Sequence, residues 1–252
     1  MKGKIRISAV RYANTYPFIW GLRKSGFEKK VILETDHPAQ CAAKLRDGKA
    51  DIGLIPVAAI TGVKNSRIIS DYCIGTNGKV RTVMLLSNCP FTSLDTINLD
   101  YRSVSSVTLA RVLAANMWKK EFTWNDTSEK TDFFDIACNE AVVLIGDQCF
   151  ESESRYKFRI DLAEEWKKYT GLPFVFACWV ANRDIDEEFR NEFNSALRLG
   201  VENIEKVAEY YGNTGKITRE ELLKYLKVNI DYHLNDEKRK AMELFLDLTK
   251  KL

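Results

Sequence analysis

Short apolar runs alternate with more polar segments along the first quarter of the chain. Three of these runs are typical of strands: Ile5–Val10, Val31–Glu34 and Asp51–Ile55. The segments between them, Tyr16–Lys24 and Ala39–Arg46, are predicted to be helices, and each begins beside a proline, whose missing N–H costs nothing there. Strands separated by helices predict a mainly parallel sheet that is covered on both faces.

The next apolar runs have a different arrangement. Ile68–Gly75 and Val80–Leu86 are joined across Asn77-Gly78, which is a strong turn signal because both residues tolerate a positive φ. The second of these runs is well placed to leave one domain and enter another. A second set of strands and helices follows, comprising Thr96–Leu99, Ser105–Trp118, Ala141–Ile145 and Asp161–Tyr169.

The last third of the chain begins with an aromatic-rich strand, Pro173–Ala181, which is placed to return to the first domain. Three amphipathic helices are then predicted, Asp186–Tyr211, Thr218–Lys227 and Asn235–Lys250, with Thr218 and Asn235 as suitable N-caps. The aromatic cluster of Trp166, Phe174, Phe176 and Trp179 favours core packing over a cofactor site.

This order of elements predicts an α/β protein with two lobes. Residues 1–87 and 175–252 are expected to form lobe 1 and residues 88–174 lobe 2, with hinges near 86–89 and 173–177. A hinged arrangement of this kind normally binds a small ligand in the cleft between its lobes.

Charge and composition exclude several classes of protein. The chain has 252 residues, with 38 Lys and Arg against 35 Asp and Glu, and this small excess argues against a nucleic-acid surface. The longest apolar run is about ten residues, short of the ~20 that span a bilayer, and no signal segment is apparent. The six cysteines form no Cys-x-x-Cys pair. We therefore expect a soluble cytoplasmic protein with reduced thiols and no membrane partner, either monomeric or homodimeric.

The usual catalytic motifs are missing from the sequence. There is no phosphate-binding glycine loop, no dinucleotide fingerprint, no nucleophile elbow and no His-Glu-x-x-His. The two histidines, His37 and His233, are expected to lie at the surface or at a helix start. A histidine-dependent triad or metal site is therefore not expected, and neither a cofactor nor a metal is predicted.

Polar residues instead follow the predicted strands at their carboxyl ends, where open α/β sheets bind ligands. Tyr12 and Asn14 follow the first strand, and Pro56 ends the third. The Asn14 amide is placed either to contact a ligand or to cap the next helix, and its position favours neither.

Three further sites, which comprise five residues, can likewise either contact a ligand or serve a structural role. Ser105 and Ser106 begin a helix, where hydroxyls and free N–H groups suit either a carboxylate ligand or simple capping. Gly146 and Asp147 follow a buried strand, and the glycine allows a ligand to approach the backbone. Arg81 lies near the expected hinge, either as a ligand cation or in a structural ion pair.

These same segments resemble the chorismate dehydratase family. The resemblance rests on "ISAVRYANTYPFIWGL", "LRDGKADIGLIP", "TNGKVRTVMLLS", "SVSSVTLARVL", "AVVLIGDQCF" and "GLPFVFACWVAN", in family order from residue 5 to about 182. It implies the type II periplasmic-binding-protein-like fold, with the ligand cleft between the lobes. It also implies a carbon–oxygen lyase (hydro-lyase) of the futalosine route to menaquinone.

The resemblance further implies the substrate and the site. Chorismate, a dianion, would lose water to give 3-[(1-carboxyvinyl)oxy]benzoate, with its own enolpyruvyl carboxylate removing the ring proton. Asn14 matches the family's catalytic asparagine, and Thr82 matches a catalytic hydroxyl residue that is usually serine. The residues expected to bind substrate are Tyr12, Pro56, Arg81, Ser105, Ser106, Gly146 and Asp147.

Some positions depart from the family pattern, and two other functions compete. Val104 and Ser105 stand where the family usually has Arg-Thr, which puts an arginine contact at that point in doubt. One competing function is a non-catalytic small-carboxylate-binding protein of the same fold. The other is a relative of 1,4-dihydroxy-6-naphthoate synthase, which relies on a histidine in its second lobe. Neither His37 nor His233 lies in the segment expected to form that lobe.

Overall fold

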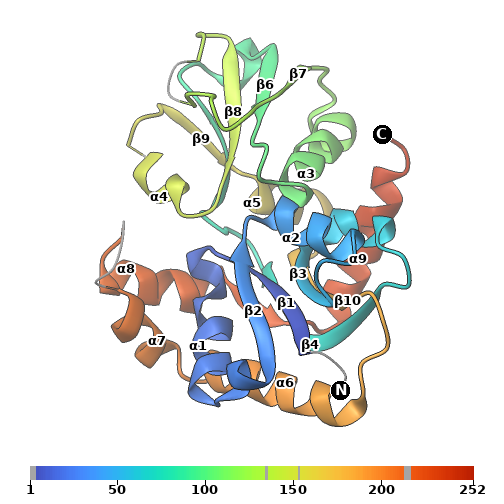
Figure 1. Cartoon of the computed structure of the whole chain (residues 1–252). Coiled ribbons are helices and arrows are strands. Elements are labelled where there is room, and N and C mark those ends of the chain that lie inside the picture. The colour runs from blue at the N-terminus through green and yellow to red at the C-terminus, as the bar shows by residue number, and fades with distance from the viewer. Residues whose placement is uncertain (1–3, 134–135, 153, 213–216) are drawn as a thin grey trace.

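The computed structural model describes residues 4–133, 136–152, 154–212 and 217–252. Its strands form two separate mixed sheets, one with six strands and one with five. Figure 1 shows the two sheets as two lobes, the five-stranded one above and the six-stranded one below, with helices packed around each. The expected α/β class and two-lobed architecture are thus confirmed.

The six-stranded sheet has the order β11-β4-β10-β3-β1-β2. Its strands are β1 (Ile5–Val10), β2 (Val31–Asp36), β3 (Ile52–Pro56), β4 (Arg67–Thr76), β10 (Phe174–Ala181) and β11 (Asp231–His233). β1 is parallel to β2 and β3, as the alternation of strands and helices predicts. β10 lies antiparallel between β3 and β4, because it enters the sheet after the chain has passed through the other lobe.

The five-stranded sheet has the order β7-β6-β8-β5-β9. Its strands are β5 (Val83–Ser87), β6 (Thr96–Leu99), β7 (Thr123–Asp126), β8 (Glu140–Ile145) and β9 (Phe158–Asp161). β6 is parallel to β7 and β8, whereas β5 is antiparallel to β8 and β9.

The chain changes sheet earlier than the sequence suggests. β4 ends at Thr76 in the six-stranded sheet, and β5 begins at Val83 in the five-stranded sheet. β5 therefore does not belong to the first lobe, where the boundary at residue 87 places it, and the first crossing is residues 77–82 rather than 86–89. The reason is that β5 pairs on both edges with β8 and β9, a long-range pairing that the local pattern does not reveal.

The helices are α1 (Tyr16–Lys24), α2 (Pro38–Arg46), α3 (Ser105–Leu113), α4 (Gln148–Ser152), α5 (Leu162–Thr170), α6 (Glu187–Val201), α7 (Ile204–Tyr211), α8 (Arg219–Lys224) and α9 (Asp236–Thr249). α3 and α8 each continue into a π-helical turn, Ala114–Trp118 and Tyr225–Asn229. The helix expected over Asp186–Tyr211 is instead two helices. Asn203 leaves helical geometry between them, and its side-chain amide donates to the Leu199 carbonyl at 2.8 Å.

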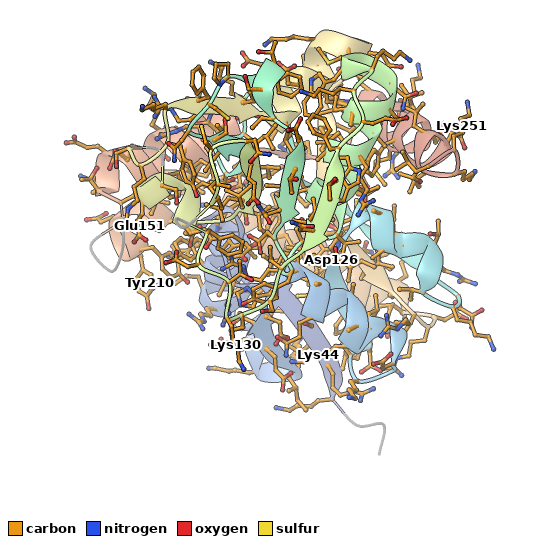
Figure 2. All side chains as sticks on the ribbon, turned by 90° about the horizontal axis from the view of Figure 1, so that it is seen from above. Lys44, Asp126, Lys130, Glu151, Tyr210 and Lys251 are labelled. Atoms are coloured by element: carbon orange, nitrogen blue, oxygen red, sulfur yellow. The ribbon has the colours of Figure 1, made fainter. Side chains whose placement is uncertain are left out.

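The core confirms most of the aromatic interpretation. Trp166, Phe174 and Trp179 are fully buried, whereas Phe176 also lines the cavity described below. In a view from above, the charged side chains of Glu151 and Lys251 lie at opposite sides of the molecule (Figure 2). Within the described residues, none of the helices has both the length and the apolar character that a membrane crossing needs.

Candidate functional site

A small cavity that is partly open to solvent lies between the two sheets. Seven of the nine residues predicted for the site line it: Tyr12, Asn14, Pro56, Thr82, Ser105, Ser106 and Gly146. Arg81 and Asp147 do not line it. The cavity is thus lined by residues at the carboxyl ends of β1, β3 and β8, in the 77–82 crossing and at the start of α3.

Asn14 lies in the short 3-10 turn Ala13–Thr15 between β1 and α1. Its side chain does not cap α1, whose N-cap residue is Thr15. The Asn14 Oδ1 accepts a hydrogen bond from the Thr15 hydroxyl at 3.1 Å, and the backbone carbonyl of Asn14 accepts one from the buried Tyr232 hydroxyl at 3.0 Å. The capping alternative is therefore excluded, and the Asn14 side chain lies in the cavity wall.

Thr82 is buried in the crossing directly before β5. Its carbonyl accepts from the Gly146 N–H at 2.9 Å, which attaches it to the end of β8. Its Oγ1 lies 2.8 Å from the hydroxyl of Tyr225, a residue of the π-helical turn that follows α8. The sequence showed Tyr225 only as one aromatic position of an amphipathic helix, and nothing in that pattern pointed to the site.

Arg81 contributes through its backbone. It has a positive φ of 63°, and its N–H donates to Asp161 Oδ2 at 2.8 Å, beside the Val80 N–H at 2.9 Å. Its guanidinium lies over the Phe150 ring, 5.5 Å from the centroid. Asp161 also caps α5, and its burial raises the pKa of the carboxyl to about 6, although the N–H groups that it accepts from lower it. Arg81 and Asp161 together fix the backbone that carries Thr82.

The two serines at the start of α3 have different surroundings. The Ser105 hydroxyl donates to the Phe176 carbonyl at 3.0 Å and accepts from the Ala58 N–H at 3.2 Å, so it joins α3 to the other lobe. The Ser106 N–H is capped by the Ser103 hydroxyl at 3.2 Å. The Ser106 hydroxyl has no hydrogen-bond partner among the described residues, and Ser106 lines the cavity, so this hydroxyl is the one that a ligand can use.

Gly146 and Asp147 are both needed at the end of β8, for separate reasons. Gly146 has a φ of 72°, and a Cβ there would lie 2.6 Å from Cε1 of the Tyr12 ring. The Asp147 carboxylate accepts from the Ala13 N–H, at 2.9 Å to Oδ1 and 3.2 Å to Oδ2. Asp147 was expected to bind substrate, but it holds the turn that carries Asn14, because the free N–H at the start of that turn attracts a carboxylate.

His37 supports the site from behind Tyr12. The Arg11 guanidinium hydrogen-bonds to His37 Nε2, and the Tyr12 hydroxyl lies 3.1 Å from Nδ1. Burial, and then the positive charges of Arg11 and Arg102, lower the pKa of His37 and favour the neutral ring. Burial raises the pKa of the Tyr12 phenol. Tyr12 is thus a neutral hydrogen-bonding group beside the cavity.

No charged residue is among the described residues that line the cavity. An anion held there would meet hydroxyls and the N–H groups at the start of α3, a nine-residue helix, instead of a lysine or arginine. The described part of the chain also holds no group of three or more His, Cys, Asp or Glu that could bind a metal ion.

The sequence from residue 5 to residue 251 matches the profile of a family described as menaquinone biosynthesis. The chain belongs to this family. The chorismate dehydratase of Thermus thermophilus is 24% identical to this chain over 261 residues, which cover 94% of this chain and 92% of that enzyme. The resemblance drawn from the motifs is therefore confirmed at the level of the family.

Solved structures show the fold that this member of the menaquinone biosynthesis family adopts. A protein from Archaeoglobus fulgidus superposes with a TM-score of 0.77 at 16% identity, covering 98% of this chain and 97% of that one. A Candida albicans protein with the generic periplasmic binding protein fold gives 0.70 at 13% identity, covering 99% and 91%. The periplasmic aliphatic sulphonate binding protein SsuA of Escherichia coli gives 0.60 at 12%, covering 100% and 93%. The fold is therefore that of periplasmic binding proteins.

Proposed function

We propose that this protein is a chorismate dehydratase, a hydro-lyase that converts chorismate to 3-[(1-carboxyvinyl)oxy]benzoate and water. One observation carries the proposal: Asn14, which follows β1 of the six-stranded sheet, and Thr82, which lies in the crossing that leads into the five-stranded sheet, match the two catalytic positions of that family and line the same cavity. The similarity to the Thermus enzyme over nearly the whole chain supports it.

The reaction removes a ring proton and a ring hydroxyl, and the ring becomes aromatic. Aromatisation supplies a large driving force, so the protein needs mainly to hold the substrate in a reactive geometry. The cavity fits that requirement because its described lining contains no carboxylate or histidine that would serve as a strong base. In the proposal the enolpyruvyl carboxylate of the substrate accepts the ring proton, and the electrons of the broken C–H bond enter the ring as the C–O bond breaks. Asn14 and Thr82 donate hydrogen bonds to the departing oxygen, which takes up the proton that the carboxylate has accepted and leaves as water.

The start of α3 is the proposed binding point for one substrate carboxylate. Ser106 presents its hydroxyl there, and the N–H groups of the helix start carry the positive end of the helix dipole. Gly146 leaves room for the Tyr12 ring, which lies where a Cβ at residue 146 would be. Arg81 and Asp147, which were expected to contact substrate, are proposed to hold Thr82 and Asn14 in place instead.

The test is to mix the purified protein with chorismate and to record the ultraviolet spectrum over time. We expect the chorismate absorption to be replaced by that of a substituted benzoate, with the product identified by mass spectrometry. A protein that binds chorismate in calorimetry without forming the aromatic product would be a carboxylate-binding protein of this fold, and the dehydratase proposal would fail.

The naphthoate-forming alternative lacks support from the structure. His37 precedes α2 and His233 ends β11, so both belong to the lobe of the six-stranded sheet. The histidine on which that sister enzyme relies is expected in the other lobe. The cytoplasmic location expected from the sequence stays a prediction.

A further inference from the structure

Behind the cavity lies a buried phenol to which the proposed function gives no role. Tyr225 is fully buried and belongs to the π-helical turn Tyr225–Asn229, which continues α8. Its ring packs edge-on against Phe150 of the other lobe, with centroids 5.1 Å apart. π-helical turns occur frequently at functional sites, since they redirect a side chain without ending the helix.

The Tyr225 hydroxyl contacts one of the two proposed catalytic side chains. It lies 2.8 Å from Thr82 Oγ1, a contact in which either oxygen could be the donor. Among the described residues this is the only hydrogen bond of the Tyr225 hydroxyl, and a fully buried O–H group without an acceptor is costly. The phenol hydrogen is therefore donated to Thr82 Oγ1.

This direction of hydrogen bonding decides what Thr82 can do. Since its Oγ1 accepts from Tyr225, its own hydrogen cannot lie along that contact. The other acceptor nearby in the protein is the Val80 carbonyl at 3.5 Å, at the limit of a hydrogen bond. The Thr82 hydroxyl is thus available to donate to an oxygen in the cavity.

The protonation state of Tyr225 is consistent with this chain of donors. Burial raises the pKa of the phenol, and its hydrogen bond with Thr82 lowers it by less. The phenol therefore stays neutral at physiological pH. It is suited to orient its neighbours and is not suited to act as a base.

We propose that Tyr225 is a positioning residue that fixes the Thr82 hydroxyl as a hydrogen-bond donor directed at the departing oxygen of the substrate. This rests on the proposed dehydratase function. Tyr225 touches no substrate atom, because it does not line the cavity. Its effect passes through the Thr82 side chain that it holds.

The first test is Tyr225→Phe, which removes one oxygen and keeps the ring against Phe150. We expect kcat with chorismate to fall about 10- to 100-fold while KM changes less than about twofold, because the loss falls on donors needed in the transition state. Tyr156→Phe is the matched control. Tyr156 is another buried tyrosine, and its hydroxyl donates to the Phe133 carbonyl, outside the cavity. Equal kcat values for the two variants would overturn the proposal.

The second test asks whether Tyr225 acts through Thr82. In the Thr82→Val background, Tyr225→Phe should lower kcat much less than it does in the wild type, because the hydroxyl that it orients is gone. Independent, multiplicative losses in kcat would show that Tyr225 does not act through Thr82 and would overturn the proposed route.

A third measurement needs no variant and no activity. The Tyr225 hydroxyl proton, buried and hydrogen-bonded, should exchange slowly and give a nuclear magnetic resonance cross-peak to the Thr82 side chain. Its absence in the folded wild type would overturn the arrangement even if Tyr225→Phe does not fold. If the wild type leaves chorismate unchanged while the cross-peak is present, the dehydratase function has failed and the hydrogen-bond arrangement stands.

Discussion

The two sides of the cavity are built differently. The side that belongs to the six-stranded sheet consists of polar side chains on a short turn. The side that belongs to the five-stranded sheet consists of a helix start and a glycine turn. Asn14 and Tyr12 belong to the first side, and Ser106 and Gly146 to the second. The first side is held by groups distant in sequence, among them Asp147 and Tyr232. The second depends more on backbone geometry. In the proposed function, Asn14 of the first side acts in the chemistry together with Thr82 of the 77–82 crossing, and Ser106 of the second side binds the substrate.

The largest expected effect tests the chemical side. Asn14→Ala should lower kcat about 100-fold or more, because it removes a donor aimed at developing charge. The fold should persist, since the turn keeps its backbone bonds to Asp147 and Tyr232. Steady-state kinetics with chorismate and circular dichroism check this, with the exposed Asn125→Ala as control. Near-normal turnover would remove Asn14 from the mechanism.

The next effect tests the glycine turn. Gly146→Ala combines a positive φ of 72° with a Cβ 2.6 Å from the Tyr12 ring. The variant should therefore be less stable and have a higher KM than the wild type. Gly171→Ala is a matched control, because Gly171 has the same φ and nothing within 4 Å of its Cβ. We expect about 1 kcal/mol of destabilisation from the backbone at Gly171 and clearly more at Gly146. Equal losses in chemical denaturation would contradict the close approach of Tyr12.

A moderate effect distinguishes the two serines of α3. Ser106→Ala should raise KM about 5- to 10-fold with little change in kcat, because its hydroxyl binds the ground state and transition state alike. Ser105→Ala should instead lower the free energy of unfolding by about 1–2 kcal/mol, since it leaves the Phe176 carbonyl and Ala58 N–H without their partner. If both variants change KM equally, the two hydroxyls share one role.

The smallest effect concerns His37 and pH. Because its pKa is lowered in the folded protein, protonation favours the unfolded chain, and the stability contributed by neutral His37 is lost as pH falls below about 6.5. The loss should stay below about 1 kcal/mol, since solvent screens this partly exposed group. His37→Gln should make unfolding less sensitive to pH between 7.5 and 5.5. His233→Gln is the control, and an identical change there would contradict this role for His37.

Much of this arrangement could be predicted locally. The bounds of β1, α1 and β6 follow from periodicity and proline placement, and the Thr218 capping box and the Asn235 N-cap are present as predicted. The short elements β7, β9, β11 and α4 were missed, because three to five residues carry too little periodicity to be recognised.

The residues that line the cavity could be predicted in part. Asn14 follows a strand and Ser106 begins a helix, positions that local sequence reveals, whereas Thr82 was expected within a strand and was given a catalytic role only through the family resemblance. The roles of Asp147 and Arg81 could not be predicted, because each depends on a backbone N–H or carboxylate supplied by a distant segment. Tyr225 is the clearest case, since its hydrogen-bond partner Thr82 lies 143 residues away in the sequence.

By itself the sequence determined the α/β class, the family, and the residue types collected at the strand ends, because these depend on local periodicity and on motifs read in order. Only the tertiary structure decided that β5 joins the five-stranded sheet, that Asp147 binds the Ala13 N–H, and that Tyr225 lies behind Asn14 and Thr82. The physical reason is that hydrogen bonds between distant segments depend on how the two lobes pack together, and no local pattern encodes that packing.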